Sequence, residues 1–486
     1  MSKIKRNYIL NTIFQVMRLL TPLVVTPYIS RFLGVDGVGI FSYTYSVQYY
    51  FSIFAVLGTV GYGAREIARH RDEPEKLSHL FWEIWLLAVG TSLISLSVWT
   101  VVILCSGEYQ MYYLILTFYV LAAMLDISWF YTGLEKFPVI VLRNIALRLT
   151  EVALVFLLVK KPEHLYIYFL IMAGGTFLGN VSLWAGMGKN LTKVCWRDIK
   201  PLRHLKGTLV FFLPTIATSI YTVLDKTLIG LITKDTAENG AYEQATKIID
   251  VAKAVSFVSL NTVLGPRSSY LFSQNKIEEA KKNLKSSLNF MLMLCFGVSF
   301  GIIGVADIFV PWFFGEGFEG VVLLLKCLAP IIVVISISNA LGYQYYDPAG
   351  LRLKSAKYLV VGASCNLVLN CLLIPKFAGA GAVIGSVASE FVISALYLKN
   401  SDGYLRLGEL IRMGWKKLVA GAVMMVFLLF RQRSYEPAVV DIVLLVLQGL
   451  GVYFAVLLVL WDSLLTGVLK GVAQKAKGIL SKDKKE

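Results

Sequence analysis

Residues 80–106 read LFWEIWLLAVGTSLISLSVWTVVILCS, a run in which Glu83 is the single charged residue. An α-helix rises about 1.5 Å per residue, so about 20 apolar residues cross the ~30 Å hydrocarbon core of a bilayer. A helix satisfies its own backbone hydrogen bonds inside that core. The run is too long and too continuously apolar for the alternating strands of a membrane barrel. It therefore predicts a transmembrane α-helix.

The same pattern recurs along the whole chain. Of the 486 residues, 57% are hydrophobic and 16% are charged, whereas about 25% of a typical soluble domain is charged. We expect fourteen transmembrane helices, which leaves no room for a sizeable soluble domain, and the predicted fold class is an all-α polytopic membrane protein. The helices are expected near residues 8–29, 39–62, 80–106, 110–132, 139–159, 164–187, 207–232, 241–264, 286–312, 321–342, 355–375, 378–398, 413–431 and 437–460.

Loop charge orients these helices. The net charge is +16, from 47 Lys and Arg against 31 Asp and Glu. In a soluble protein this excess would suggest nucleic acid, but cytoplasmic loops of membrane proteins also accumulate Lys and Arg, so we expect no nucleic-acid partner. Most of the cations lie in one alternating set of segments: 1–7, 63–79, 133–138, 188–206, 265–285, 343–357, 399–417 and 461–486. This set is assigned to the cytoplasm together with both termini, which requires an even number of helices.

A faint internal repeat divides the helices into two sets. LGTV at 57–60 ends the second predicted helix and LNTV at 260–263 ends the eighth, while Gly39 and Gly240 open them. Six helices separate these positions, so the two halves would have the same orientation, a parallel repeat about an axis along the membrane normal. We expect two six-helix lobes around a central cavity. The predicted order is an N-terminal lobe (1–187), a basic cytoplasmic linker (188–206), a C-terminal lobe (207–398), two added helices (399–460) and a basic tail (461–486).

Charged residues inside the predicted helices are the candidates for function. A charge at the centre of the bilayer costs about 2.5–3.5 kcal/mol on insertion scales, and such residues usually face the bundle interior or a water-filled cavity. Arg18 lies near the middle of the first helix, on one face with Asn11 and Gln15, and its own helix holds no acid to neutralise it. We therefore expect Arg18 to face a polar cavity.

Two further helices carry charged stripes for which pairing within the helix competes with a role in the cavity. In the fifth predicted helix, Arg148 and Glu151 are three residues apart on one face, and Arg143 lies nearer the cytoplasm. In the eighth, Lys247 stands four residues after Glu243. Either pair can neutralise itself along its own helix, and both alternatives stay open.

The remaining embedded polar residues are possible ion-coupling or gating groups. Tyr221 and Asp225 share one face of the seventh helix, and the adjacent Lys226 argues against an isolated carboxylate at Asp225. Asp126 in the fourth helix and Lys326 in the tenth are equally well explained as packing residues. Sequence spacing alone does not separate these interpretations.

No metal or enzyme signature stands out. The six cysteines and four histidines are scattered without the spacing of metal ligands. A polysaccharide polymerase or glycosyltransferase would need acids, histidines or a metal motif in a sizeable loop, and the longest predicted loops are short and basic. A channel would show a filter-like motif or a ring of charges of one sign, and neither is visible.

The first block of sequence resembles a known family. Residues 27–73, PYISRFLGVDGVGIFSYTYSVQYYFSIFAVLGTVGYGAREIARHRDE, closely resemble the start of Wzx/RfbX-type polysaccharide flippases. These belong to the MOP superfamily, which also holds the MATE exporters and the lipid II flippase MurJ. Shorter matches are WFYTGLEKF (129–137), GYQYYDPAG (342–350) and Tyr221-x-x-x-Asp225-Lys226-x-x-x-Gly230. The resemblance covers about residues 5–400.

The resemblance implies movement of an undecaprenyl-diphosphate-linked oligosaccharide to the outer leaflet of the bacterial cytoplasmic membrane by alternating access, for O-antigen or capsule synthesis. The diphosphate would bind cavity cations: Arg18 first, then Arg65, Arg148 and Arg267, because a guanidinium matches phosphate oxygens bidentately. Lys247, Gln15 and Asn11 complete the predicted substrate-binding set. Polysaccharide polymerase and glycosyltransferases are the implied partners.

Transport would need no cofactor and would be driven by a cation gradient or the membrane potential. Asp225, Glu151 or Asp126 would bind a coupling cation. Aromatic residues are 13% of the chain, and the candidates for stacking on sugars are Tyr43, Tyr45, Tyr49 and Tyr50. Packing and interfacial anchoring is the favoured interpretation of these tyrosines.

A MATE-like exporter of small cationic molecules is the alternative function, because it would share the fold. Its cavity would need a net acidic charge. The charged residues inside the predicted helices are nearly balanced, and unpaired Arg18 favours an anion instead.

Overall fold

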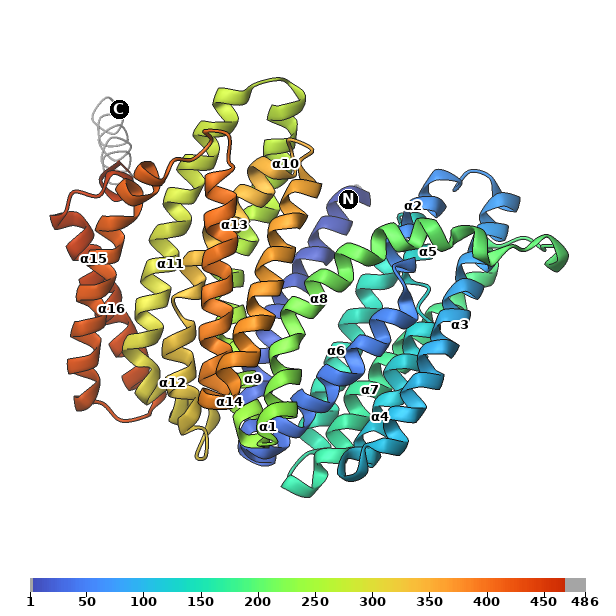
Figure 1. Ribbon diagram of the computed structural model, residues 1–486, viewed down its shortest axis with the longest axis horizontal. Helices are drawn as coiled ribbons and strands as arrows, with labels where there is room; N and C mark the ends of the chain where they lie inside the picture. Colours follow the sequence, from blue (N-terminus) through green and yellow to red (C-terminus); the bar gives the residue numbers. More distant parts are fainter. Residues whose placement is uncertain (1–2, 468–486) are drawn as a thin grey trace, which may run out of the picture. The chain divides into compact units, whose positions relative to one another are not determined.

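A computed structural model describes residues 3–467, apart from the side chains of residues 3–13, 18–19, 189–190, 214, 217–218 and 220–222. Every regular element in this part of the chain is helical (Figure 1). Nine helices of the described residues are long and apolar enough to cross a membrane, and a tenth span results if the bent pair α12 and α13 counts as one. The chain is therefore an all-helical polytopic membrane protein.

The number of apolar helices is smaller than the fourteen expected, partly because two expected pairs of helices follow each other across a kink with no loop between them. Helix α1 (Lys3–Val56) runs through both of the first two predicted helices, and only Gly34 has non-helical backbone angles. Helix α14 (Arg352–Lys399) likewise joins the eleventh and twelfth, with a break at Ala378.

The chain divides into two compact units, residues 1–243 and 244–486. Unit 1 holds α1, α2 (Thr59–Arg69), α3 (Pro74–Cys105), α4 (Gln110–Met124), α5 (Ser128–Gly133), α6 (Phe137–Leu158), α7 (Leu165–Ser182), α8 (Leu205–Thr233) and the start of α9 (Thr236–Lys253). The apolar core of unit 1 lies between α1, α3, α4 and α7, with Leu33, Trp99, Leu116 and Phe169 at its centre.

Three connections of unit 1 lie at one end of its helices, drawn at the top of Figure 1. They are the α2–α3 loop, the α5–α6 loop and the segment that leads into α8. Arg71 binds Glu135 across the first two, with 2.9 Å between Nη1 and Oε1. Aromatic side chains fill the space beneath, where Phe81, Trp129 and Phe130 are buried. We call this the basic-loop end of unit 1.

Unit 2 holds the rest of α9, a π-helical turn η6 (Ala254–Val258), α10 (Ser259–Ser273), α11 (Ile277–Phe314), α12 (Glu319–Leu328), α13 (Ile331–Leu341), a second π-helical turn η7 (Gly342–Tyr346), α14, α15 (Leu407–Arg431) and α16 (Val439–Val459). The last two helices pack on α11 and on each other. Met424, Leu428, Leu445 and Tyr453 form their shared apolar core.

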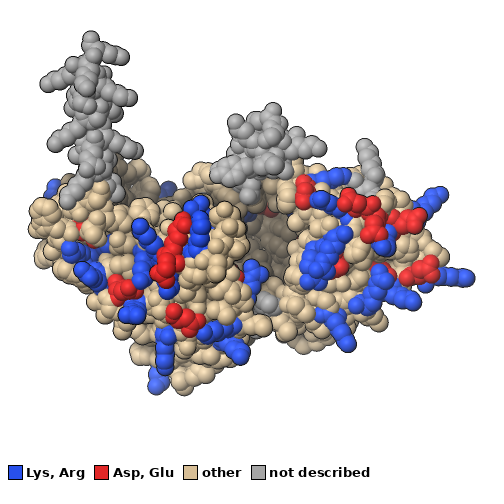
Figure 2. All heavy atoms as spheres, turned by 90° about the horizontal axis from the view of Figure 1, so that it is seen from above, with Lys and Arg blue, Asp and Glu red and all other residues tan. Residues whose placement is uncertain are grey.

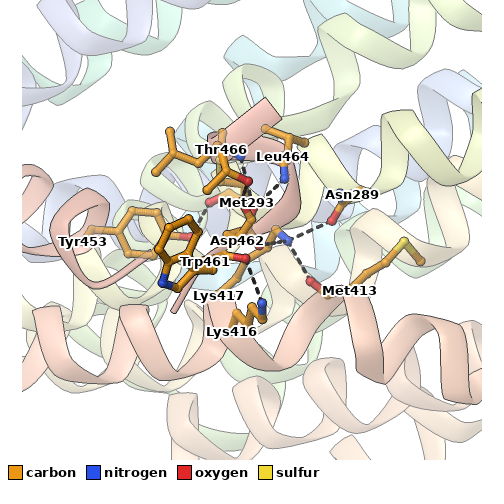
Figure 3. A network of polar contacts seen from close by, with 11 residues as sticks. Asn289, Met293, Met413, Lys416, Lys417, Tyr453, Trp461, Asp462, Leu464 and Thr466 are labelled. Atoms are coloured by element: carbon orange, nitrogen blue, oxygen red, sulfur yellow. Dashed lines mark hydrogen bonds and ion pairs between the residues drawn. The ribbon is translucent and has the colours of Figure 1, made fainter. Parts of the chain in front are cut away.

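A buried ion pair fastens the end of α16 to α15 and α11 (Figure 3). The Lys417 and Asp462 side chains are 1% and 3% exposed, with 3.0 Å between Nζ and Oδ2. The Lys417 ammonium also donates to Asn289 Oδ1 at 2.8 Å and to the carbonyl oxygen of Met413 at 2.7 Å. Asp462 Oδ1 in turn accepts the backbone N–H of Leu464 at 3.0 Å. A buried pair with its remaining hydrogen bonds satisfied holds three segments in one geometry.

Candidate functional site

Helices α1 and α9 cross with their backbones in direct contact. A Cβ added to Gly39 would lie 1.8 Å from the carbonyl oxygen of Thr236, and one added to Gly240 would lie 2.1 Å from that of Val35. Only glycine allows two helices to approach so closely. The contact is reciprocal, because Val35 and Thr236 each precede a glycine by four residues. We call these four residues the glycine crossing.

Polar side chains from three helices meet one turn beyond the glycine crossing. The Lys226 ammonium of α8 lies 2.6 Å from Glu243 Oε2 of α9. Ser42 of α1 donates its hydroxyl to the same oxygen at 2.9 Å. Ser42 and Glu243 are 201 residues apart, the same offset as Gly39 and Gly240. This carboxylate therefore links α1, α8 and α9 beside the crossing.

Asp225, a predicted coupling residue, is buried and accepts a hydrogen bond from the Tyr242 hydroxyl. Lys226 follows it in the chain but contacts Glu243, because consecutive residues of a helix point in different directions. Lys226 thus contacts another helix, although the sequence places it beside Asp225. Two adjacent residues of α8, one acidic and one basic, thus contact α9.

A polar cavity of ≈ 250 Å³ lies along α6. Its lining residues are Phe14, Met17, Arg143, Asn144, Leu147, Arg148, Glu151, Thr176 and Asn180. Arg148 Nη1 is 2.9 Å from Glu151 Oε2, so the two side chains pair within this helix, which was one of the two alternatives left open by the sequence. Two guanidinium groups and one carboxylate leave one net positive charge on this described lining.

Arg143 is held by neutral groups. Its guanidinium donates to Asn180 Oδ1 at 2.9 Å, to the carbonyl oxygen of Gly179 at 3.0 Å and to Asn144 Oδ1 at 2.6 Å. These oxygens orient the side chain without cancelling its charge. Sequence reasoning placed Arg143 only near the cytoplasm and favoured Arg148, since the spacing of one helix does not reveal amides supplied by α7.

Arg65 and Arg267 each pair with an acid at the surface. Arg65 Nη2 is 3.0 Å from Glu66 Oε1, and its guanidinium lies over the Phe211 ring at 4.9 Å. In unit 2, Arg267 Nη2 is 3.3 Å from Glu279 Oε1. Exposed pairs of this kind contribute about 0–1 kcal/mol, so a stronger anion can displace the carboxylate.

The other predicted residues have more varied surroundings. Asp126 Oδ1 accepts the backbone N–H of Ser128 at 2.8 Å, which helps α5 begin after the break that follows α4. Gln15 is an exposed residue of α1, and Lys247 lies in α9 within unit 2. The side chains of Asn11, Arg18 and Tyr221 lie outside the described residues.

The tyrosines considered for sugar binding take part in packing. Tyr43 covers Gly230, where an added Cβ would lie 2.1 Å from its ring. Tyr45 and Tyr119 have ring centroids 5.3 Å apart. Tyr50 and Thr227 share a hydrogen bond of 3.3 Å between α1 and α8.

One buried network was missed by the sequence analysis. Glu83 is the single charge of the run at 80–106, and its side chain is 1% exposed. His204 Nε2 lies 2.9 Å from Glu83 Oε2, and the Tyr62 hydroxyl lies 2.7 Å from His204 Nδ1. Arg203 binds the same carboxylate. The isolated charge in an apolar run was the available signal, but its partners are more than a hundred residues away.

Comparison with known proteins gives matches along most of the chain. Residues 4–272 match the family described as "Polysaccharide biosynthesis protein" (Polysacc_synt). The "Putative O-antigen transporter" of Escherichia coli (strain K12) is 24% identical over 400 residues, covering 81% of this chain and 96% of that protein. The "Probable low-salt glycan biosynthesis flippase Agl15" of Haloferax volcanii is 24% identical over 277 residues, covering 56% of this chain and 57% of that protein.

Two solved structures have the same fold. One is "Lipid II flippase MurJ, inward closed conformation", with a TM-score of 0.73 and 14% identity, covering 94% of this chain and 99% of that one. The other is an inward-facing multidrug resistance MATE family transporter of the MOP superfamily, with a TM-score of 0.58 and 13% identity, covering 85% and 95%.

Proposed function

Because this chain belongs to the polysaccharide biosynthesis protein family, we propose that it is a flippase for lipid-linked polysaccharide precursors. The relatives named as an O-antigen transporter and a glycan biosynthesis flippase support this function, and the MurJ fold is suited to it. The chain acts as a transporter rather than as an enzyme. Its substrate is an undecaprenyl-diphosphate-linked oligosaccharide, moved from the cytoplasmic to the outer leaflet of a bacterial cytoplasmic membrane.

The observation that carries this proposal is the polar cavity along α6. A diphosphate needs fixed cations in a water-poor site, where charge-assisted hydrogen bonds are strong. Arg143 offers its charge to that cavity while neutral oxygens hold its guanidinium in place. Arg148 adds a second guanidinium whose charge Glu151 offsets. Arg18 stays in the proposed set by its place in the sequence, at the same level of the first helix as the cavity residues Phe14 and Met17.

The lengths of the helices support fourteen membrane spans. Helix α1 has 54 residues and α14 has 48, about 80 and 70 Å, which is more than twice the ~30 Å hydrocarbon core. We propose that each crosses twice and turns at Gly34 and at Ala378. Helix α6 is long enough to cross the membrane, although it carries three charged residues. Helix α8, with 29 residues, is also long enough. Counting these, with α12 and α13 as one span, gives fourteen and puts both termini on the cytoplasmic side.

We propose that the glycine crossing closes the outer side of the transporter during alternating access. Its residues adjoin the turns at Gly34 and Lys234, at the ends of helices opposite to the basic loops in the proposed topology. The backbones of α1 and α9 touch, so no passage remains between them. The polar contacts of Glu243, in contrast, can be replaced by hydrogen bonds to water. Separation of the two helices at this crossing would open the outer side.

An apolar cavity of ≈ 270 Å³ in unit 2 suits the polyprenyl tail. It lies between α11, α15 and α16, where Gly297, Gly301 and Gly449 leave space between the helices. Apolar lining of this kind binds hydrocarbon in preference to sugar or phosphate. This would give the last two helices a role in holding the lipid portion of the substrate.

Transport is proposed to need no cofactor and to use a cation gradient or the membrane potential. Glu151 and Asp225 are the carboxylates proposed for a coupling cation. An exporter of small cations is not favoured, because the described lining of the α6 cavity carries a net positive charge.

The test is translocation in proteoliposomes of a polyprenyl-diphosphate oligosaccharide with a fluorescent label, scored by quenching of the label in the outer leaflet. Arg143→Ala should slow translocation at least about tenfold, the effect of roughly 1.4 kcal/mol in a charge-assisted contact. Lys161→Ala, at an exposed loop position, is the matched control and should leave the rate unchanged. Equal rates for Arg143→Ala and the control would reject the cavity as the diphosphate site.

A further inference from the structure

Residues 191–206, here called the connecting segment, run across the basic-loop end of unit 1 into α8. They include two short turns, η4 (Trp196–Asp198) and η5 (Pro201–His204). The backbone N–H of Thr192 donates to Ser78 Oγ at 2.8 Å, and that of Lys200 donates to Glu83 Oε1 at 2.9 Å. Both acceptors belong to α3, so the segment is fixed along that helix.

The buried carboxylate of Glu83 strengthens this attachment. Its partners Lys200, Arg203 and His204 all come from the connecting segment. An ionised carboxylate away from water is strongly destabilising unless it is paired and hydrogen-bonded. These contacts hold the segment against α3, so its opposite side faces away from the protein.

The outward side combines apolar and basic residues. Trp196 is 60% exposed and Leu202 is 76% exposed. Four exposed cations lie between them or beside them, Lys193, Arg197, Lys200 and Lys206, and they outnumber the one exposed acid of the segment, Asp198. None of these four forms an ion pair with any residue that the structure describes. Figure 2 looks onto this end and shows many Lys and Arg side chains there, with Asp and Glu among them.

Tryptophans continue from this side along the helices of unit 1. The ring centroids of Trp196 and Trp82 are 5.2 Å apart, those of Trp82 and Trp85 are 5.5 Å apart, and those of Trp85 and Trp184 are 5.0 Å apart. Tryptophan gathers where a membrane protein passes from hydrocarbon to water. We therefore expect the connecting segment to lie at the level of the lipid headgroups.

We propose that the connecting segment is a binding surface for anionic phospholipids. Trp196 and Leu202 enter the boundary between headgroups and acyl chains, as the apolar side of an interfacial segment does. Lys193, Arg197, Lys200 and Lys206 then face the phosphates, where each cation near an anionic surface strengthens binding by about fivefold, or roughly 1 kcal/mol. A soluble acidic protein would match the cations but would leave the tryptophan and leucine without an apolar partner.

Lipid retention by the full-length protein tests the proposal. The protein is reconstituted in phosphatidylcholine bilayers that contain a minority of phosphatidylglycerol, extracted gently and weighed by native mass spectrometry. We expect bound phosphatidylglycerol to exceed its bulk share. The variant K193Q/R197Q/K200Q/K206Q should lose this preference by at least about fivefold, the contribution of a single cation.

The matched control removes four exposed cations of unit 2, as K276Q/K282Q/K357Q/R412Q, and should keep the preference. Equal retention by the two variants, or an unchanged preference in the first, would overturn the proposal. A second measurement leaves the charged residues unchanged. A fluorophore on Cys195, which is exposed in the segment, should be quenched more by a spin label on the lipid headgroup than by one deep in the acyl chains. Quenching by neither label would also overturn it.

Discussion

Gly39 and Gly240 pack against each other's helix in a reciprocal contact. At each glycine, a backbone carbonyl of the other helix occupies the space that a side chain would need. The carbonyls belong to Thr236 and Val35, which precede the two glycines by the same four residues. The two halves of the contact are thus equivalent under an offset of 201 residues. A two-fold interface has this reciprocal form.

Gly240→Ala should separate α1 from α9. The added Cβ would lie 2.1 Å from the carbonyl oxygen of Val35, so the helices must move apart and lose packing around Ser42 and Glu243. We expect a lower Tm in detergent and at least a severalfold change in translocation rate. Gly174→Ala is the control, because its Cβ would meet nothing within 4 Å. Identical melting and transport of the two variants would contradict the close approach.

Lys417→Ala should destabilise unit 2 strongly. It leaves the buried Asp462 carboxylate without its cation, a change that typically costs about 3–5 kcal/mol. Thermal unfolding of the purified protein, followed by the fluorescence of a thiol probe, measures the loss. Lys281→Ala breaks an exposed pair with Glu278 and should cost less than about 1 kcal/mol. The double variant K417M/D462L should regain part of the stability, and a Tm as low as that of K417A would argue against uncompensated charge as the cause.

Glu151→Gln distinguishes between two roles of the Glu151 carboxylate in the α6 cavity. The substitution frees the charge of Arg148, which is now 2.9 Å from the carboxylate. If Glu151 only balances Arg148, binding of the lipid diphosphate should be retained or tightened, as measured by titration of the purified protein. If Glu151 binds a coupling cation, the dependence of translocation on the cation gradient should vanish. Asp126→Asn is the comparison variant, because its oxygen can still accept the Ser128 N–H.

Glu83→Gln should loosen the connecting segment. The amide keeps an acceptor for the Lys200 N–H but removes the charge that Arg203 and His204 share. We expect faster hydrogen exchange in residues 191–206 and earlier cleavage by trypsin there. Glu75→Gln, an exposed position in the first turn of α3, serves as control. Unaltered exchange in the segment would mean that the neutral hydrogen bonds suffice to hold it.

Residues 80–106 by themselves determined that a helix crosses the membrane, and the structure forms α3 from Pro74 to Cys105. Hydrophobic run length is a local property, so the all-helical polytopic fold was predictable, and the resemblance of residues 27–73 indicated the family. So was the Arg148–Glu151 pair, because helix geometry fixes neighbours three residues apart. The glycines of the crossing were also visible as a repeated feature, although nothing in the sequence said that they touch.

Only the tertiary structure decided which distant groups meet. Glu83 binds residues that follow it by more than a hundred positions, Arg143 takes two of its partners from α7, and Lys226 of α8 contacts Glu243 of α9. Each of these contacts depends on how helices pack, and packing follows from the shapes of many side chains together rather than from the period of one helix. The hydrophobic pattern predicted two helices on either side of Gly34 and of Ala378, and the structure shows that the break between them is a kink at a single residue with non-helical backbone angles.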